Sequence, residues 1–277
     1  MSYDELLMKK RFKLTDRQVR EILYHREHAR NYKKCNRISY DIIENRKRRW
    51  WNSQWRMYTI LLQEKIKGKK VMIAGCGFGD DAFLLSKMGA DVYAFDISSD
   101  SLAIAADIAD RENLNIHFEE MPAENLLYKD NFFDCIVARD ILHHADIPQA
   151  FREISRVSKS GASVIINEIY SHSATDGIRH SAFVENVLYP RMAHFIYKGE
   201  ECYITEDERK VTEHDVKEIT RHLRNIKTEY FDFLSNRFFP NSYIFLSKTD
   251  RIALMILKPI SHVLGGRVLI KGTIIKR

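Results

Sequence analysis

The sequence predicts an α/β fold with an open, mostly parallel sheet covered by helices on both faces. Apolar runs such as "KKVMIAG" (69–75) and "ASVIINEIY" (162–170) lack period-two alternation, as expected for parallel strands buried on both sides. Amphipathic helical patterns separate these runs, so strands and helices alternate along the chain. A glycine-rich turn joins the first of these strands to the first of these helices.

The alternation begins at Lys69 and defines five strands and three helices. Further strands are expected at 90–96, 114–120 and 132–138, and the helices at 80–89, 98–112 and 146–161. After these come a capped helix (211–223), a strand (226–234) and an apolar helical segment (249–266). The closing strand, 267–277, is polar at alternate positions, which predicts a place near a sheet edge.

The expected domain organisation is a main domain with a helical segment before it. Residues 1–68 form an N-terminal helical lid or substrate-binding segment, and residues 69–277 form the main domain. A helical insertion is expected at about 171–211, where no clear strand pattern occurs. The strongest N-terminal helix is "RRWWNSQWRMYTILLQEKI" (48–66), with aromatic residues spaced three or four apart.

Length and composition predict a folded protein in a reducing compartment, and we expect the cytoplasm. The chain has 277 residues, 45% of them hydrophobic, enough for one large domain with an appendage. Its four cysteines show no CxxC spacing, which argues against disulfides and zinc. The N-terminal sequence lacks a signal-peptide pattern. No apolar run approaches the roughly 20 residues needed to span a bilayer.

The charge is unevenly distributed. Residues 1–70 hold 20 Lys and Arg against 8 Asp and Glu, a balance of +12, whereas the other 207 residues hold 24 against 30, a balance of −6. The basic segment suits an anionic partner such as nucleic acid or lipid head groups, or is simply a solvated helical face.

The glycine turn indicates the class of ligand. Gly75, Gly77 and Gly79 allow a sharp turn and close approach of backbone amides to a ligand. A dinucleotide fingerprint would need a further glycine where Asp80 stands, and a carboxylate there would repel a pyrophosphate. Asp96 ends the second strand, where a carboxylate can accept hydrogen bonds from ribose hydroxyls. A ribose-containing, cationic ligand without phosphate is S-adenosylmethionine (SAM).

Four segments in this order resemble the class I SAM-dependent methyltransferases. The resemblance is to the small-molecule group that includes the ubiquinone and menaquinone methyltransferases, and it covers Lys69 to about Tyr170. It implies a Rossmann-like, seven-stranded sheet, SAM as cofactor and a small-molecule acceptor. The segments are "AGCGFG" (74–79), "FDIS" (95–98), "AENLLYKDNFFDCIVARDILHH" (123–144) and "AFREISRVSKSGASVIINE" (150–168).

The resemblance also implies a set of cofactor-binding residues. Many relatives carry an acid two positions before the first glycine, but here that residue is Ile73. The SAM ammonium group is then expected near the backbone of Gly75 and Arg139, or near Asp80 or Asp140. The cofactor-binding residues implied are Gly75, Cys76, Gly77, Gly79, Asp96, Ile97, Met121, Ala123, Glu124, Arg139 and Asp140.

Candidate catalytic residues follow the fourth and fifth strands. His143 and His144 are near the expected position of the methyl group, and either could act as general base because histidine titrates near neutrality. The alternative is a structural histidine. Glu168 ends the fifth strand, at the edge of the sheet where ligands bind, and is a second candidate. No metal-ligand spacing stands out, so we expect no metal.

Four residues are assigned to the acceptor. Trp51 and Tyr58 either belong to a lid over the acceptor or pack the N-terminal segment onto the sheet. His172 and His180 lie in the insertion, which would add walls to the acceptor site.

The predicted function is methyl transfer to a hydroxyl or carbon of a small molecule such as a natural product, sugar or lipid-like precursor. One alternative is an RNA methyltransferase that uses the basic N-terminal segment, although no RNA-binding module is recognisable. Another is a peripheral membrane enzyme acting on a lipid-linked acceptor, with the apolar stretch "RIALMILKPISHVL" facing the bilayer. The sequence is compatible with a homodimer.

Overall fold

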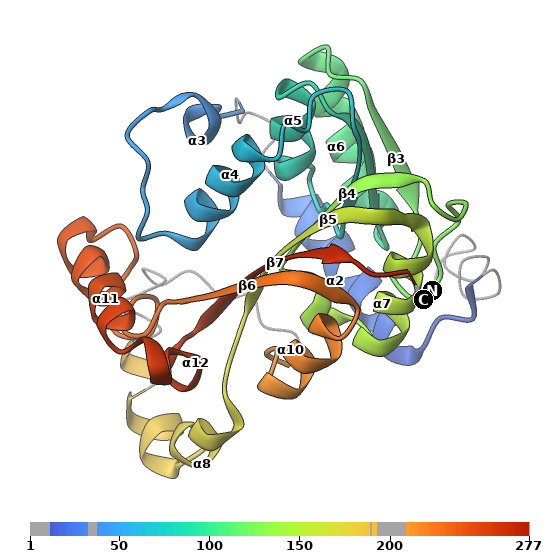
Figure 1. Ribbon diagram of the computed structural model, residues 1–277. Coiled ribbons are helices and arrows are strands. Elements are labelled where there is room, and N and C mark those ends of the chain that lie inside the picture. Colours follow the sequence, from blue (N-terminus) through green and yellow to red (C-terminus); the bar gives the residue numbers. More distant parts are fainter. Residues whose placement is uncertain (1–11, 33–37, 189, 193–208, 277) are drawn as a thin grey trace.

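The computed structural model contains a seven-stranded sheet of strand order β3-β2-β1-β4-β5-β7-β6 (Figure 1). The structure describes residues 12–32, 38–188, 190–192 and 209–276. Strands β1 to β5 are mutually parallel, and β7 runs antiparallel to both β5 and β6. The predicted seven-stranded, mostly parallel sheet is therefore confirmed. The strands are β1 (Lys70–Ala74), β2 (Asp91–Asp96), β3 (Ile116–Glu120), β4 (Phe133–Arg139), β5 (Ser158–Ile169), β6 (Leu223–Phe231) and β7 (Arg267–Ile274).

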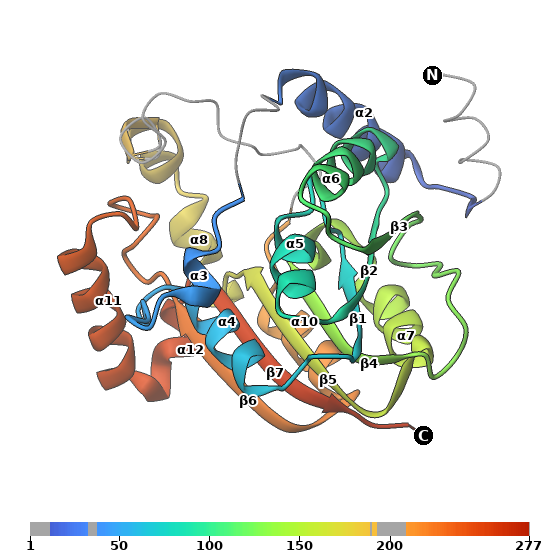
Figure 2. The same ribbon diagram turned by 90° about the horizontal axis from the view of Figure 1, so that it is seen from above.

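Helices cover both faces of this sheet (Figure 2). Those of the N-terminal segment are α2 (Asp16–Asn31), α3 (Asp41–Glu44) and α4 (Ser53–Gln63). Those between the parallel strands are α5 (Asp80–Lys87), α6 (Ser99–Arg111), the short 3-10 helix η1 (Leu142–His144) and α7 (Ile147–Val157). Those after β5 are η2 (Ser173–Thr175), α8 (Asp176–Arg179), η3 (Val184–Leu188), α10 (Glu213–Thr220), α11 (Ile244–Ile256), η4 (Lys258–Ile260) and α12 (Ser261–Leu264).

Side-chain alternation along the buried strands produces two cores. In β1, Val71 and Ile73 belong to a cluster with α4 and α5, whereas Met72 and Ala74 belong to a cluster with α7 on the other face. Successive strand residues point to opposite faces, so a strand covered on both sides must be apolar throughout. This requirement explains the continuous apolar runs in the sequence.

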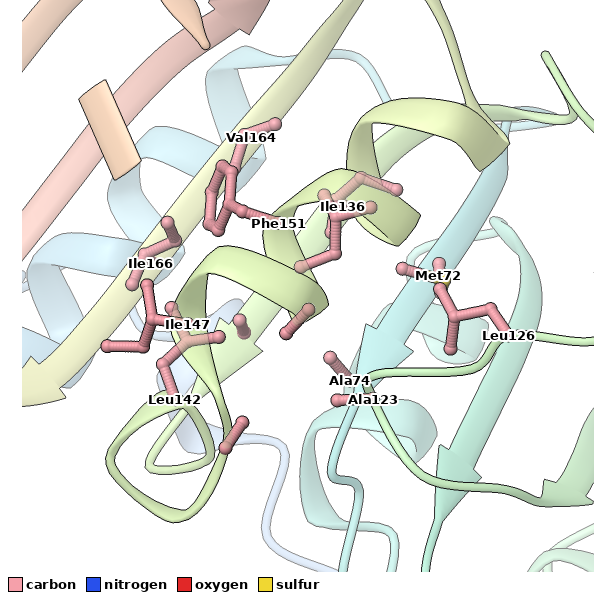
Figure 3. Packing of buried hydrophobic residues seen from close by; sticks show 14 of the residues in the cluster. Met72, Ala74, Ala123, Leu126, Ile136, Leu142, Ile147, Phe151, Val164 and Ile166 are labelled. Carbon is pink, nitrogen blue, oxygen red and sulfur yellow. The ribbon is translucent and has the colours of Figure 1, made fainter. Parts of the chain in front are cut away.

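Helix α7 shows how local sequence selects an element of this core. Asp146 caps the helix by accepting a hydrogen bond from the Gln149 amide at 2.9 Å, and Pro148 occupies the first turn, where its missing N–H is harmless. Figure 3 shows Phe151 beside Val164 of β5, within the second core. Burial of a phenylalanine side chain of this kind contributes roughly 2–3 kcal/mol. The residues on the buried side of the helix are Ile147, Ala150, Phe151, Ile154 and Val157.

The closing strand, β7, lies near a sheet edge as expected: it is the second strand from the edge, between β5 and the edge strand β6. Its polar residues are satisfied inside the fold: Lys271 forms an ion pair with Glu64 at the end of α4. Gly272 leaves room for Leu223 of β6, since a Cβ at this glycine would lie 2.8 Å from the leucine side chain. Polar alternation in β7 therefore reflects a salt bridge and close packing.

The segment before β1 and the segment directly after β5 are helical, as expected. The helical insertion after β5 is present as η2, α8 and η3, and its part at 193–208 lies outside the described residues. Among the residues that the structure describes, no helix combines the length and hydropathy required of a membrane span. The exact boundaries of the predicted domains remain a prediction.

Candidate active site

A cavity of about 1460 Å³ opens at the carboxyl ends of the parallel strands. Its walls come from α2, the turn after β1, the loops after β2, β3 and β4, and the segments that follow β5 and β6. In open α/β sheets this edge is where ligands bind, because the loops there are free to diverge from the regular sheet. The cavity therefore lies where the sequence predicts the site.

The three glycines of the turn after β1 have different roles. All have positive φ, at 62° for Gly75, 51° for Gly77 and 93° for Gly79. A Cβ at Gly77 would meet no atom within 4 Å, so this residue faces the open cavity. A Cβ at Gly75 would collide with Ile141, and one at Gly79 with Phe83. Gly79 does not line the cavity, so its role here is to pack the start of α5 rather than to touch a ligand.

Asp96 fixes the glycine turn. One carboxylate oxygen accepts from the Gly77 amide at 2.8 Å and the other from the Ser98 amide at 3.0 Å. The side chain is buried, yet it lines the cavity. A carboxylate has about four acceptor positions, so each oxygen keeps capacity for one more donor. Two ribose hydroxyls match that capacity.

Most of the predicted cofactor residues meet in this one cavity. Glu124 is among them, but one of its oxygens accepts from Gln18 of α2 at 2.9 Å and the other from the Asp146 amide at 2.8 Å. Its carboxylate therefore also joins the lid to the start of α7. The predicted residues that line the cavity are Gly75, Cys76, Gly77, Asp96, Ile97, Met121, Ala123, Glu124, Arg139 and Asp140.

Arg139 lines the cavity and belongs to a network of charged and polar side chains at the end of β4. Its Nε donates to Asp81 at 2.6 Å, and the Tyr58 hydroxyl donates to the other oxygen of Asp81 at 2.5 Å. Asp81 holds the pKa of Arg139 above its ordinary value, and burial raises the pKa of Tyr58 well above its own. Asp140 accepts from Arg139 and from Arg267 of β7. This network keeps Arg139 charged and oriented at the end of β4.

Two residues predicted to touch the acceptor do not reach the cavity. Tyr58 is fully buried in the core with α4 and α5, which matches the alternative that this helix packs the N-terminal segment onto the sheet. Trp51 lies outside the lining, with the Lys248 ammonium 4.7 Å from its ring. Aromatic residues three or four positions apart are expected both in a helix that packs onto the sheet and in a helix that covers a site as a lid. The spacing alone could therefore not decide between the two interpretations.

His143 and Glu168 form a buried pair at the cavity wall. His143 Nδ1 lies 2.7 Å from one oxygen of Glu168, and the other oxygen accepts from the amides of Ile141 and Leu142 at 2.8 and 2.7 Å. His143 lines the cavity, whereas Glu168 is fully buried behind it. Glu168, predicted as a catalytic candidate, is therefore placed to orient His143 and does not reach the cavity.

His144 is held by the lid. Its Nδ1 lies 3.1 Å from Glu21 of α2, its backbone carbonyl accepts from Arg17, and its ring centroid is 4.0 Å from that of His143. It lines the cavity, but its contacts join η1 to α2. Both histidines have a buried carboxylate partner, but that of His143 is fully buried and is also held by two backbone amides, as expected for the partner of a general base.

Asp140, His143 and Glu168 offer potential metal-ligand atoms within 4.8 Å of one another. Asp140 already accepts from two arginines, and Glu168 from two backbone amides and from His143. A cation at this position would have to displace these donors and would be repelled by the arginines. The arrangement suits an ion-pair network better than a metal centre.

Helix α2 supplies cavity residues that the sequence prediction missed. Its capping box at Thr15 starts the helix, and an ion pair between Arg26 and Asp100 joins it to α6 at 3.1 Å (Figure 2). The cavity-facing residues recur at spacings of three and four, which is a polar stripe on one helical face and was a readable signal. These residues are Gln18, Glu21, His25 and His28.

The lid also touches the glycine turn directly. Phe78 stands between Gly77 and Gly79 in the turn. Its ring centroid lies 5.4 Å from that of His28 and 4.3 Å from that of Tyr32. Burial lowers the pKa of His25, which faces the cavity from the same helix. Helix α2 therefore closes the end of the cavity that contains Gly77 and Asp96.

The other end of the cavity combines apolar side chains with polar and charged ones, among them Arg209, Lys210 and Arg237. The insertion supplies His180, which pairs with Glu185 at 2.9 Å, whereas the predicted His172 lies outside the lining and contacts the His262 ring at 5.5 Å. Asp232 also lines this end, and burial raises its pKa to about 6. The apolar residues here are Ile178, Val184, Leu188, Met192, Phe233, Phe238, Val263 and Leu264.

Comparison with known proteins identifies a domain in the central part of the chain. Residues 73–166 match the family model described as a methyltransferase domain. They form a class I SAM-dependent methyltransferase domain. The methyltransferase domain begins in β1 and ends in β5, so it contains the glycine turn, Asp96 and His143.

Relatives of this methyltransferase domain act on small molecules according to their names. The chain is 28% identical to phosphoethanolamine N-methyltransferase 3 of Arabidopsis thaliana, over 61% of this chain and 36% of that protein. It is 29% identical to a ubiquinone biosynthesis O-methyltransferase of Coxiella burnetii, over 43% of this chain and 56% of that protein. The chain thus spans only part of the length of both relatives. These matches confirm the resemblance to small-molecule methyltransferases.

A solved structure extends the likeness in fold beyond the methyltransferase domain. Phosphoethanolamine N-methyltransferase 2 of Haemonchus contortus superposes with a TM-score of 0.52 at 17% identity, covering 80% of this chain and 53% of that one. At this identity the likeness shows the fold alone.

The cavity fits SAM, the cofactor of this domain. Gly77 leaves open space beside Asp96, and the buried Met121 offers an apolar surface for a base. Ile73 is buried in β1 and cannot hold the ammonium group. Asp80 lines the cavity, and burial raises its pKa, so a cationic ligand would favour its charged form. Asp80 is thus placed to balance the charge of SAM.

Proposed function

We propose that this protein transfers a methyl group from SAM to a hydroxyl or acidic carbon of a small molecule, with His143 as the general base. The observation that supports the proposal is the buried pair of His143 and Glu168 at the cavity wall. An acceptor that must lose a proton needs a base within reach, and an oriented imidazole is the usual one.

Glu168 selects the tautomer of His143. With the Nδ1 proton donated to the carboxylate, Nε2 is the basic nitrogen of the neutral ring. When bound, SAM would supply an activated methyl group on its sulfonium, a methyl carbon whose bond to sulfur breaks as the bond to the acceptor forms, leaving a neutral thioether. His143 Nε2 would take the acceptor proton. The Ile141 and Leu142 amides keep Glu168 fixed while this proton moves.

The cavity wall indicates the acceptor's shape. The end formed by the insertion and by the segments after β6 has apolar side chains beside cationic ones such as Arg209 and Arg237, so it suits an acceptor with an apolar body and a polar or anionic group. Covering by α2 at the opposite end would limit water around the sulfonium, and positioning of this kind is worth up to about 7–11 kcal/mol in favourable cases.

The two relatives' names contrast an amine acceptor with a hydroxyl acceptor. The Arabidopsis relative is named for N-methylation of phosphoethanolamine and the Coxiella relative for O-methylation in ubiquinone biosynthesis. A hydroxyl gains nucleophilicity by losing its proton, and a protonated amine must also lose a proton before its lone pair can attack. The base alone therefore serves either acceptor, and the proposal of a hydroxyl is supported by the apolar side chains of the cavity, which suit a larger and less polar molecule than phosphoethanolamine.

The test is methyl transfer from SAM that carries a deuterated methyl group. The purified protein is incubated with phenols bearing alkyl chains of increasing length and, separately, with phosphoethanolamine, and products are identified by mass spectrometry. We expect deuterated methyl ethers from the phenols and no product from phosphoethanolamine. Methylation of phosphoethanolamine alone would contradict the proposal.

A further inference from the structure

Helix α11 presents its apolar side to solvent and its polar side to the protein. The buried residues of α11 are Ser247, Asp250 and a single leucine, Leu254, whereas Phe245 is 77% exposed and Ile256 is 74% exposed. A surface helix of a globular protein ordinarily shows the reverse pattern. Figures 1 and 2 show α11 at the outer edge of the molecule, beyond β6.

Polar contacts explain how this helix stays attached. The Asp250 carboxylate accepts from the amides of Leu234 and Ser235 at 2.8 and 3.2 Å. Arg251 donates to Glu229 of β6 at 2.7 Å, and its guanidinium lies 3.8 Å from the centre of the Phe231 ring. The helix is therefore anchored by its polar side, and its apolar residues are left for another partner.

Large exposed apolar side chains recur along α11 and at both of its ends, and we call them together the α11 face. Single exposed apolar residues are common on proteins, but a contiguous group of large ones marks an interaction site. The α11 face consists of Tyr243, Ile244, Phe245, Leu246, Ile252, Met255, Ile256, Leu257 and Ile260.

The surroundings of the α11 face are cationic. Between residues 235 and 266 the only carboxylate in the sequence is that of Asp250, which is buried, while Lys258 is exposed. The Lys248 ammonium lies 4.7 Å from the Trp51 ring, which brings the loop between α3 and α4 against α11 (Figure 2). Exposed residues of this loop are Arg46, Lys47, Arg49 and Trp50; Arg49 forms an ion pair with Asp41 of α3 at 3.3 Å, so Arg46 and Lys47 supply most of the loop's positive charge.

We propose that the α11 face docks on the surface of an anionic lipid bilayer. An apolar helical face inserts among acyl chains, cations beside it attract anionic head groups, and tryptophan favours the boundary between the two. The alternative occupant is a protein partner with acidic groups around an apolar groove. The test must distinguish such a partner from a lipid bilayer. Phe238, Val263 and Leu264 line the cavity and flank α11, so docking would bring the acceptor end of the cavity close to the membrane.

The first test is co-sedimentation of the full chain with phosphatidylcholine vesicles, with and without phosphatidylglycerol. We expect binding to the anionic vesicles and little to the neutral ones. The variant Phe245→Ser/Ile256→Ser should reduce the bound-to-free ratio at least about tenfold, because it removes two large apolar contacts. Leu127→Ser is the matched control, since Leu127 is also exposed but lies in the loop before β4.

The second test addresses charge. Lys47→Gln/Lys258→Gln should weaken binding at low salt and have little effect at high salt. Lys129→Gln/Lys217→Gln removes the same charge elsewhere on the surface and should change nothing beyond a small general effect. SAM affinity, measured by calorimetry, should be that of the unmodified protein in every variant, which checks folding.

Three outcomes would overturn the proposal. One is the absence of binding to anionic vesicles by a protein that binds SAM. Another is equal binding by the unmodified protein and Phe245→Ser/Ile256→Ser. The third is a dimer in light scattering that Phe245→Ser/Ile256→Ser converts to a monomer without any vesicle binding, which would make the α11 face a subunit interface. None of these outcomes depends on whether the acceptor is a hydroxyl.

Discussion

Asp96 combines structural and ligand-binding roles in one buried carboxylate. It accepts from the amides of Gly77 and Ser98, and it lines the cavity beside the space that a Cβ at Gly77 would enter. The turn is thus held open by the same group that is placed to meet the ribose of SAM.

Asp96→Ala should weaken SAM binding by about 10- to 100-fold, since hydrogen bonds to a charged group contribute about 1.5–3 kcal/mol. Calorimetry measures the dissociation constant directly. Asp110→Ala, at an exposed position of α6, should leave the affinity unchanged. Equal affinities for the two variants would contradict the assignment of Asp96 to the ribose.

Asp232 gives the protein a measurable pH dependence. Burial raises its pKa to about 6, above the ordinary value near 3.9 of an unfolded chain. The folded state therefore binds the proton more tightly, and stability falls as pH rises from about 4 to about 6. Above that range the charged form costs roughly 2–3 kcal/mol.

Asp232→Asn should remove this cost, because asparagine is neutral and tolerates the positive φ of 60° at this position. We expect thermal denaturation to show a higher Tm than the unmodified protein at neutral pH and a similar Tm near pH 4. Asp110→Asn should show no such difference. A Tm gap that does not change with pH would contradict the assigned pKa.

Single residues also show the limits of prediction from sequence. The glycine turn and Asp96 were predictable because their spacing reflects local backbone geometry. Asp140 and Arg267 are 127 positions apart, so their ion pair requires the strand order of the folded sheet. Glu168 was predicted as a base, and only its full burial shows that it supports His143 instead.

Among the elements, α2 connects the cofactor end of the cavity to the rest of the fold. Ile22 is buried in the core on the α7 side, whereas the adjacent Leu23 is 45% exposed. Gln18 and Glu21 on the same helix hold Glu124 and His144. Packing of one isoleucine therefore keeps several cavity contacts in place.

Ile22→Asp should detach α2, because a charged side chain cannot be buried there without a partner. We expect a weaker SAM affinity in calorimetry, with the sheet still folded by circular dichroism. Leu23→Asp is the matched control and should bind SAM normally. If both variants bind SAM equally well, α2 is not part of the cofactor site.

The elements of the parallel sheet were predictable because strands buried on both faces must be apolar. The place of β7 near the edge was also predictable from its polar residues, but its pairing with both β5 and β6, with Lys271 bound to Glu64 and Gly272 against Leu223, was not. The polar stripe on α2 was readable, but nothing in the sequence indicates which surface it faces.

At the scale of the whole molecule, the segment that matches the family model and the proposed acceptor site come from different parts of the chain. The family model covers residues 73–166, whereas α2, the insertion and α11 lie outside it. The methyltransferase chemistry was therefore predictable from motifs, and the acceptor end of the cavity was not. The basic N-terminal segment remains compatible with an anionic partner, and the RNA alternative stays a prediction.

The most direct measurement is the rate of methyl transfer by His143→Ala at saturating SAM, relative to the unmodified protein. With His143 as general base, the rate should fall by about 10²–10⁴, while the dissociation constant of SAM stays the same. A rate close to that of the unmodified protein would contradict the central claim. So would a loss of SAM binding large enough to explain the lower rate.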